Sequence, residues 1–394
     1  MLFCSWTELD VTSGTPVILC DLLAHFGPGR AEAVTEFNAD NKRRREIHVE
    51  HPIHKVRFHQ RLWPFRRGSR IRRKLARMGT PLLVAALRRR VREFRPDAIF
   101  TVYAQAHWIL ATWLVSRLTG VPLIYHVHDA FLEQTHGRRN SRFASWLERK
   151  TLTSARVLVL HDHLAEHYRE RYGIECTVLR HIVRHAPLPA APQNASGECV
   201  IGFSGAVYDS NSRQLTELAR RVADDPRLKL KIWSGESEQS LRAMGIDGPR
   251  VEIGYESNYE RLLGHLAGCD LLYLPLAFHD GTNIAADSLQ FSFPTKSLDY
   301  LLTGRPILVH CPAEFELSRF FVKHNCGYVL NDAPSEAVGK WLDAWRAGRV
   351  APLDDADRLR TLALYSPEEN KRLLWKVLGE EVDRAAGHAT RGEP

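Results

Sequence analysis

The stretch SFPTKSLDYLLTGRPILV, residues 292–309, decides the fold. It predicts a short loop, a helix, a stop and a buried strand. Pro294 suits the first turn of a helix, where a backbone N–H would have no intrahelical partner. Leucines at helical spacing follow it, namely Leu298, Leu301 and Leu302. Gly304 then ends the helix, and the apolar run 306–309 predicts a strand of the core.

The start of this helix carries residues that suit a nucleotide. Ser292 and Thr295 are candidate caps, because their hydroxyls can accept hydrogen bonds from free backbone N–H groups. Those N–H groups and the positive end of the helix dipole favour a phosphate, and Lys296 would add a point charge to the same anion. Asp299 would accept hydrogen bonds from a ribose. The alternative is a capped helix that leads into a core strand and binds nothing.

Short apolar segments alternate with helical stretches along the whole chain, which predicts parallel sheets with right-handed crossovers. The segment 188–197, LPAAPQNASG, has the composition of a linker between two halves. The fold class is therefore α/β, with two doubly wound halves. The strands are expected at 2–6, 97–102, 121–129, 155–160 and 176–181, and then at 198–205, 228–235, 251–255, 269–276 and 305–310.

The run PTKSLDY followed by GRP, within residues 294–306, resembles the donor-binding motif of family-4-like glycosyltransferases with the GT-B architecture. This resemblance implies two Rossmann-like domains that face each other across a cleft. The first, 1–187, would bind the acceptor, and the second, 198–365, would bind the nucleotide sugar. The amphipathic helix predicted over 366–385 would cross back to the first domain. The donor would be a nucleotide diphosphate sugar, UDP-linked, with no cofactor and no metal.

The strand 121–129 ends in the polar residues His126, His128 and Asp129. The two histidines face the same side of a strand, and the carboxyl end of a parallel strand is where ligands bind. The resemblance implies that these residues lie near the transferred sugar and the acceptor. His126 or His128 would hydrogen-bond sugar hydroxyls, and Asp129 would orient a nucleophile or act as a base. The alternative is a helix cap and a satisfied core histidine. Gly14, in the first strand-to-helix loop, would approach the donor and the acceptor.

The turn that opens the second half contains Ser204 and Gly205. Glycine lets a backbone approach a diphosphate closely, and the resemblance implies such a contact here. The family often places an arginine and a lysine shortly after this turn. That pair is not evident in this chain, and Arg213 is the candidate substitute.

Further positions bear on the donor. The resemblance puts the nucleotide base near the turns after two later strands, where Tyr255 or Trp233 would pack on it. The alternative is that these aromatic rings only cover the edge of the sheet. Phe291 stands eight residues before Asp299, where the retaining enzymes of the family carry a glutamate. The stereochemical outcome of the reaction therefore stays open.

Composition places the chain among ordinary globular proteins, with 394 residues, 44% hydrophobic and 25% charged. No apolar run approaches the ~20 residues of a membrane-spanning helix, and no signal peptide is evident. The seven cysteines show no zinc spacing and no Cys-x-x-Cys pair, which favours reduced thiols in a cytoplasmic protein. The run 161–163, His-Asp-His, resembles a metal cluster by composition alone, and a helix cap is the better interpretation.

Positive charge gathers in the first half, where residues 1–187 hold 31 Lys and Arg against 17 Asp and Glu. Such a patch attracts anionic lipid headgroups, acidic glycans or nucleic acid, and a peripheral place on the inner face of the plasma membrane is one expectation. The alternative is a solvated helix face. The excess lies between Lys42 and Arg95, beside Trp63 and Phe65, and its centre is Arg66, Arg67, Arg70, Arg72, Arg73, Lys74 and Arg77.

The predicted function is a metal-independent, hexosyltransferase-like transfer of a sugar to a glycan, lipid-linked or small-molecule acceptor, as in polysaccharide biosynthesis. A sugar-nucleotide epimerase on the same fold is the enzyme alternative, because fold does not determine chemistry. An epimerase needs no second substrate. The wide basic face would bind such a substrate, so it favours sugar transfer. A basic nucleic-acid-binding protein is the alternative of another class. No nucleic-acid module accompanies the patch, so nucleic acid is not expected as a partner.

Overall fold

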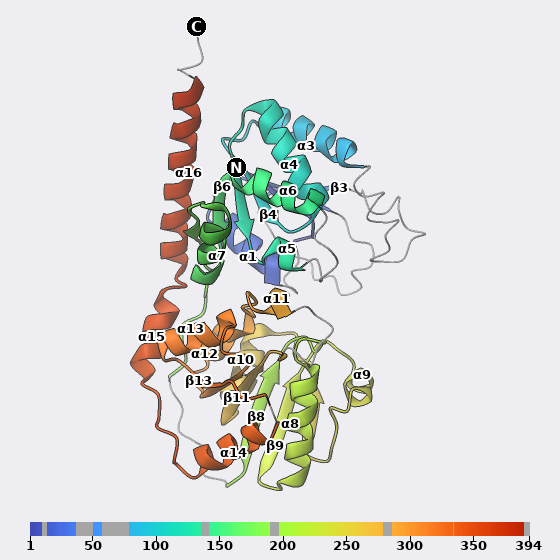
Figure 1. The fold of residues 1–394 in the computed structure, drawn as a ribbon, viewed down its shortest axis with the longest axis vertical. Helices are drawn as coiled ribbons and strands as arrows, with labels where there is room; N and C mark the ends of the chain where they lie inside the picture. Colours follow the sequence, from blue (N-terminus) through green and yellow to red (C-terminus); the bar gives the residue numbers. More distant parts are fainter. Residues whose placement is uncertain are drawn as a thin grey trace. The chain divides into compact units, whose positions relative to one another are not determined.

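Two parallel sheets with helices between their strands make up the protein (Figure 1). This computed structural model describes residues 1–9, 14–36, 50–56, 79–134, 142–189, 197–278, 286–333 and 335–389. The chain divides into two compact units. Unit 1 holds Met1–Ile182 and Pro367–Pro394, and unit 2 holds Val183–Ser366. The predicted α/β class with two doubly wound sheets is confirmed.

The sheet of unit 1 has seven strands in the order β3-β2-β1-β4-β5-β6-β7. The chain starts in its middle and winds outward in both directions. Strands such as IFTVY and LIYHV are buried along their whole length, as expected where helices cover both faces of a sheet. The strands are β1 Leu2–Ser5, β2 Glu32–Glu36, β3 Ile53–Val56, β4 Ile99–Tyr103, β5 Leu123–Val127, β6 Arg156–Val159 and β7 Thr177–Val178.

The last helix, α16 Pro367–Ala389, belongs to unit 1, although the chain passes through unit 2 before it (Figure 1). Leu374 and Val377 join the core formed by β1 and α1. The Asn370 side chain donates to the carbonyl of Arg180 at 2.6 Å and lies 3.0 Å from Nε2 of His25. The other helices of the unit are α1 Gly14–Leu23, α3 Thr80–Phe94, α4 Ala106–Thr119, α5 Phe131–Gln134, α6 Arg142–Leu152 and α7 Asp162–Tyr172.

The sheet of unit 2 has six parallel strands in the order β10-β9-β8-β11-β12-β13. They are β8 Cys199–Ser204, β9 Leu228–Trp233, β10 Val251–Gly254, β11 Leu271–Pro275, β12 Ile307–His310 and β13 Tyr328–Leu330. The helices are α8 Ser212–Asp224, α9 Glu238–Ala243, α10 Tyr259–Ala267, α11 Ala286–Leu289, α12 Lys296–Leu302, α13 Glu316–His324, α14 Ser335–Arg346 and α15 Asp355–Ala363.

The stretch 292–309 forms the helix α12, a glycine stop and the buried strand β12, as predicted. Gly304 has φ +66°, a left-handed conformation that costs glycine little. The predicted cap at Thr295 is wrong, because its backbone is already helical and its side chain makes no capping hydrogen bond. Its carbonyl accepts from the N–H of Leu298 at 3.1 Å instead.

The strands β2, β3 and β13 were not predicted. In β2, EAVTE, all five residues are buried, yet glutamates stand at both ends. Arg90 donates to both oxygens of Glu32, at 2.6 and 2.8 Å. The indole N–H of Trp108 donates to Glu36 at 3.0 Å. The partners that make these buried carboxylates tolerable lie far away in the chain, so the local hydropathy pattern does not indicate a strand.

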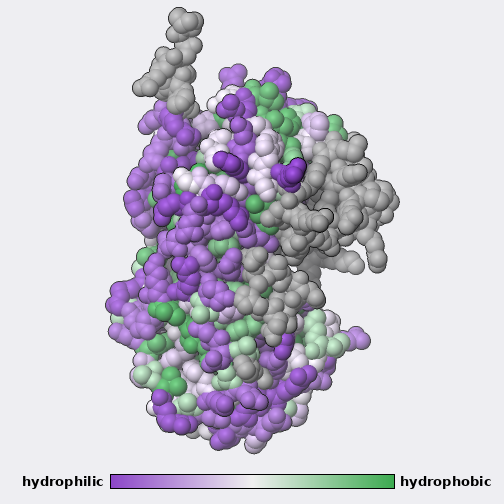
Figure 2. All heavy atoms as spheres, viewed as in Figure 1, coloured by the Kyte–Doolittle hydropathy of each residue, from purple (hydrophilic) through white to green (hydrophobic). Residues whose placement is uncertain are grey.

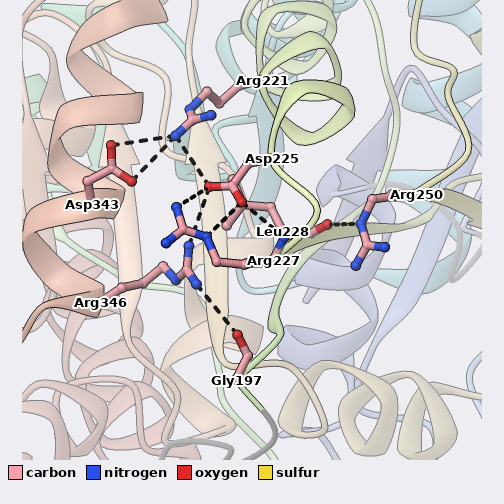
Figure 3. Close-up of polar contacts among 8 residues, drawn as sticks. All are labelled: Gly197, Arg221, Asp225, Arg227, Leu228, Arg250, Asp343 and Arg346. Atoms are coloured by element: carbon pink, nitrogen blue, oxygen red, sulfur yellow. Dashed lines mark hydrogen bonds and ion pairs between the residues drawn. The ribbon is translucent and has the colours of Figure 1, made fainter.

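A buried carboxylate in unit 2 accepts hydrogen bonds from three arginines beside the start of β9 (Figure 3). Asp225, 3% exposed, accepts from the Arg227 guanidinium through both oxygens at 2.9 Å. Arg221 and Arg346 donate to it at 3.4 and 3.5 Å. These guanidiniums, Arg227 foremost, hold the pKa of Asp225 well below its usual range. The network ties α8, β9 and α14 together.

Hydrophilic residues cover most of the described surface on the face drawn in Figure 2, and apolar residues form small patches between them. Among the described residues, no helix is long and apolar enough to cross a membrane. The basic residues predicted as a patch between Arg66 and Arg77 lie outside the described residues. Most of the predicted linker, 190–196, also lies outside them, but the N–H of Leu188 donates to the carbonyl of Leu302 in unit 2 at 2.8 Å.

Candidate functional site

The candidate donor site lies in unit 2, at the edge where the parallel strands end. The turns after β8, β9 and β10 are joined there by backbone hydrogen bonds. The N–H of Gly205 donates to the carbonyl of Trp233, and the N–H of Ser234 donates to the carbonyl of Gly254, both at 2.9 Å. Ligands of open parallel sheets bind at this edge, because the loops that follow the strands converge on it.

Lys296, the first residue of α12, reaches the turn after β8. Its Nζ lies 3.9 Å from the ring centroid of Phe203, a cation–π contact. Gly205 has φ +102°, and a Cβ at this position would lie 3.1 Å from the lysine Nζ. A larger residue at position 205 would therefore displace the ammonium group. Ser204, also predicted for this site, is 3% exposed, and its N–H donates to the hydroxyl of Tyr300 on α12 at 2.8 Å.

The Lys296 ammonium has no hydrogen-bond or ion-pair acceptor among the residues that the structure describes. Its side chain is half-buried, and burial lowers the pKa of Lys296 to about 7, against the opposite effect of the Asp299 carboxylate. A bound anion would raise this pKa again and hold the proton on the lysine. The position is therefore suited to a negative group that a ligand brings.

Asp299 lies one turn further along α12. Its Oδ1 accepts from the hydroxyl of Tyr259 at 2.6 Å, and the Tyr259 ring packs on the His185 ring with centroids 4.8 Å apart. Burial raises the pKa of Asp299 to about 6, although the Tyr259 hydroxyl and Lys296 oppose the shift. Tyr259 thus orients the carboxylate, which is still largely ionised at neutral pH. An ionised carboxylate is suited to accept hydrogen bonds from the hydroxyls of a ribose.

Three further residues of the predicted donor site lie at other positions of unit 2. Tyr255 follows β10 and is 63% exposed. Arg213 lies in the first turn of α8, where its Nε donates to Glu217 at 3.1 Å. Ser292 precedes α12, and its N–H donates to the carbonyl of Leu289 at 2.9 Å. Their contact with the donor stays a prediction.

Unit 1 holds the second group of predicted residues, where β1 and β5 end. His128 Nδ1 lies 3.2 Å from the Thr15 hydroxyl, and its Nε2 lies 3.1 Å from Nδ1 of His126. His126 Nε2 lies 3.1 Å from the carbonyl of Leu179. Gly14, predicted to approach the ligands, begins α1 directly before Thr15. The structure therefore brings Gly14, His126 and His128 together.

Burial dominates the electrostatics of this group. It lowers the pKa of His126 to about 3 and that of His128 well below the usual range. His181 is a third buried ring whose positive charge would disfavour protonation of both, and burial lowers its pKa to about 4. Asp129 follows His128 and is half-buried.

Several residues of the two candidate sites were not predicted from the sequence. Phe203 and Tyr259 contact the two motif residues of α12, and Thr15 and His181 adjoin the histidine pair. A polar residue beside the predicted glycine was the available signal for Thr15. The ring of Tyr259 carries no such signal, because it stands 40 residues before its partner.

The interpretation of 161–163 as a helix cap is confirmed. His161 is the N-cap of α7, and its Nδ1 accepts from the N–H of Leu164 at 3.3 Å. Within the part of the chain that the structure describes, no group of three or more His, Cys, Asp or Glu residues is placed to hold a metal.

Comparison with known proteins bears on the family and the fold of the chain. Residues 18–180 match the family model described as "Glycosyl transferase 4-like domain". No curated protein sequence matches the chain. Sucrose-phosphate synthase from Thermosynechococcus elongatus is a similar solved structure, with a TM-score of 0.62 and 14% identity over 100% of this chain and 99% of that one.

Two further solved structures share the architecture. HepE from Anabaena in complex with UDP has a TM-score of 0.64 and 14% identity, over 96% of this chain and 99% of its own. The α,α-trehalose 6-phosphate synthase from Burkholderia multivorans has a TM-score of 0.59 and 13% identity, over 100% and 98%. The predicted GT-B fold is therefore confirmed.

Proposed function

We propose that this chain, whose residues 18–180 match the glycosyl transferase 4-like model, is a glycosyltransferase of the GT-B fold. It transfers a sugar from a UDP-sugar to a hydroxyl of a glycan or lipid-linked acceptor. The observation that carries the proposal is Lys296. Its ammonium stands at the carboxyl edge of the unit 2 sheet, beside the glycine turn after β8, with no acceptor among the described residues. A diphosphate supplies that acceptor.

The donor side of the proposal assigns one role to each residue of unit 2. Lys296 binds the diphosphate and stabilises the negative charge that develops on it as the sugar leaves. Gly205 leaves room for the lysine and for a phosphate next to the backbone. Asp299, oriented by Tyr259, accepts hydrogen bonds from the ribose. Support for UDP comes from HepE, which was solved with UDP and with UDP-glucose.

Unit 1 supplies the other part of the chemistry. His126, His128 and Asp129 follow one another where β5 ends, next to the start of α1. We assign this group to the sugar and the acceptor, with Asp129 orienting the attacking hydroxyl. Because Lys296 provides positive charge at the leaving group, the reaction is proposed to proceed without a metal, and addition of EDTA should leave turnover unchanged.

Donor binding should take up a proton near pH 7 to 8. The pKa of Lys296 is about 7 in the free protein, and a bound diphosphate would raise it, so a lysine that is partly neutral before binding becomes charged on binding. Affinity for UDP-glucose should fall as pH rises above 7, where the free lysine has lost its proton. Calorimetry in HEPES and in Tris at pH 7.5 measures the uptake through the difference in buffer ionisation heat. Equal heats in the two buffers would contradict this role of Lys296.

The basic region of the first half supports a further proposal, that the enzyme binds anionic membrane surfaces. Each Lys or Arg near such a surface contributes ~1 kcal/mol, and salt screens the attraction. Replacement of Arg70, Arg72, Arg73 and Lys74 by glutamine should reduce sedimentation with phosphatidylserine vesicles at low salt. UDP binding should stay unchanged, because the residues proposed to bind the nucleotide belong to unit 2. If the unmodified protein shows no salt-sensitive sedimentation, the charge serves a soluble acidic acceptor instead.

A further inference from the structure

The hydrogen-bonded chain from Thr15 through His128 and His126 to Leu179 can run in one direction only. The Leu179 carbonyl accepts, so His126 must donate to it from Nε2. Burial keeps both imidazoles neutral, and a neutral ring carries one N–H. Nδ1 of His126 is therefore an acceptor, and it takes the Nε2–H of His128. Nδ1 of His128 in turn accepts a hydrogen bond from the Thr15 hydroxyl.

This direction leaves His128 with no free hydrogen-bonding site. Both of its nitrogens are engaged inside the protein, and the residue is only 7% exposed. Thr15 is half-buried and stands at the outer end of the chain, in the first turn of α1. Its hydroxyl donates a hydrogen bond to His128, and the oxygen accepts no hydrogen bond from the residues that the structure describes. A hydroxyl that donates within such a chain is polarised into a better acceptor.

We propose that Thr15 Oγ1, and not an imidazole nitrogen, accepts a hydrogen bond from a hydroxyl of the transferred sugar. His128 and His126 are then positioning residues that aim the threonine. His126 fixes the tautomer of His128, because its Nδ1 accepts a hydrogen bond from the Nε2–H of His128. Without it, His128 could adopt the other tautomer, donate to Thr15 and turn the threonine into a donor. The inference rests on the proposed function, and it identifies the atom through which unit 1 recognises the sugar.

The tautomer of His128 can be measured without any ligand. In the ¹⁵N spectrum of histidine-labelled protein at pH 7, His128 and His126 should both be neutral with the proton on Nε2. Thr15→Val should shift the Nδ1 resonance of His128, which loses its donor, and Thr15→Ser should restore it. A His128 protonated on Nδ1, or on both nitrogens, would overturn the inference, because Thr15 would then accept from the ring.

Calorimetry with UDP and UDP-glucose tests the ligand contact. Thr15→Val should weaken UDP-glucose binding by roughly 10-fold, the loss of one hydrogen bond with its sugar partner left unsatisfied, and leave UDP binding unchanged. Thr15→Ser should stay within about 2-fold, since it keeps the hydroxyl. Thr119→Val is the matched control, because that half-buried hydroxyl donates to the Val115 carbonyl of its own helix.

The two possible failures give different results. A protein that binds neither UDP nor UDP-glucose contradicts the proposed function. A protein that binds both, and keeps its full UDP-glucose affinity in Thr15→Val, contradicts the role of Thr15 alone.

Discussion

Replacement of Lys296 by methionine is expected to lower sugar transfer by about 10²–10³-fold, the effect of removing one charged group that stabilises a developing anion. Donor affinity should fall by a smaller amount, about 1.5–3 kcal/mol, the usual contribution of a charge-assisted hydrogen bond. Methionine keeps an apolar stem against the Phe203 ring, so the fold should persist. UDP release from UDP-glucose measures the turnover, and calorimetry measures the affinity.

Lys340→Met is the control for this experiment. Lys340 is an exposed lysine on α14 of the same unit, and its loss removes the same formal charge. Turnover of this variant should match that of the unmodified protein. The donor site would have to be placed elsewhere if Lys296→Met kept normal turnover and normal affinity in a folded protein.

Asp225→Asn is expected to be the most destabilising single change in the arginine network of unit 2, by about 2–4 kcal/mol. Asparagine keeps the shape of the side chain, but it removes the charge that Arg221, Arg227 and Arg346 share (Figure 3). This loss of stability is smaller than the loss from breaking a fully buried ion pair, because the Arg227 side chain is 61% exposed and solvent screens its charge. In calorimetry the Tm of unit 2 should fall by on the order of 10 °C.

The pH dependence of this effect has a definite sign. The folded pKa of Asp225 is depressed, so its stabilising contribution is complete above the unfolded aspartate pKa of about 3.9 and is lost as pH falls toward the folded value. The difference in Tm between the two proteins should therefore persist at pH 5 and shrink below pH 4. Asp343→Asn is the control, since that carboxylate is 48% exposed and accepts hydrogen bonds from the Arg221 guanidinium at 3.4 and 3.5 Å. If it destabilises as much as Asp225→Asn, the buried carboxylate is not the centre of the network.

Local chemistry was enough to predict much of the donor side. The stop at Gly304, the strand after it and the place of Lys296 at the start of a helix all depend on residues within one or two turns of each other. Apolar strands such as β5 and β8 were predicted for the same reason, because a strand covered on both faces is apolar along its whole length. The polar ends of those strands then indicated the site.

Contacts between distant residues decided the rest. The strand β2 carries glutamates that are tolerable when buried only because Arg90 and Trp108 reach them from other elements. Tyr259, the orienting partner of Asp299, lies on a different helix.

The sequence by itself determined that this chain forms two parallel α/β sheets and that Lys296 stands at a helix start, since periodicity and turn residues act over a few positions. It also indicated that His128 lies where a strand ends. Only the tertiary structure decided which way the hydrogen bonds of His128 run. That direction depends on the Leu179 carbonyl, which can only accept, and on the burial that keeps both rings neutral. Neither is a property of the residues next to His128 in the chain.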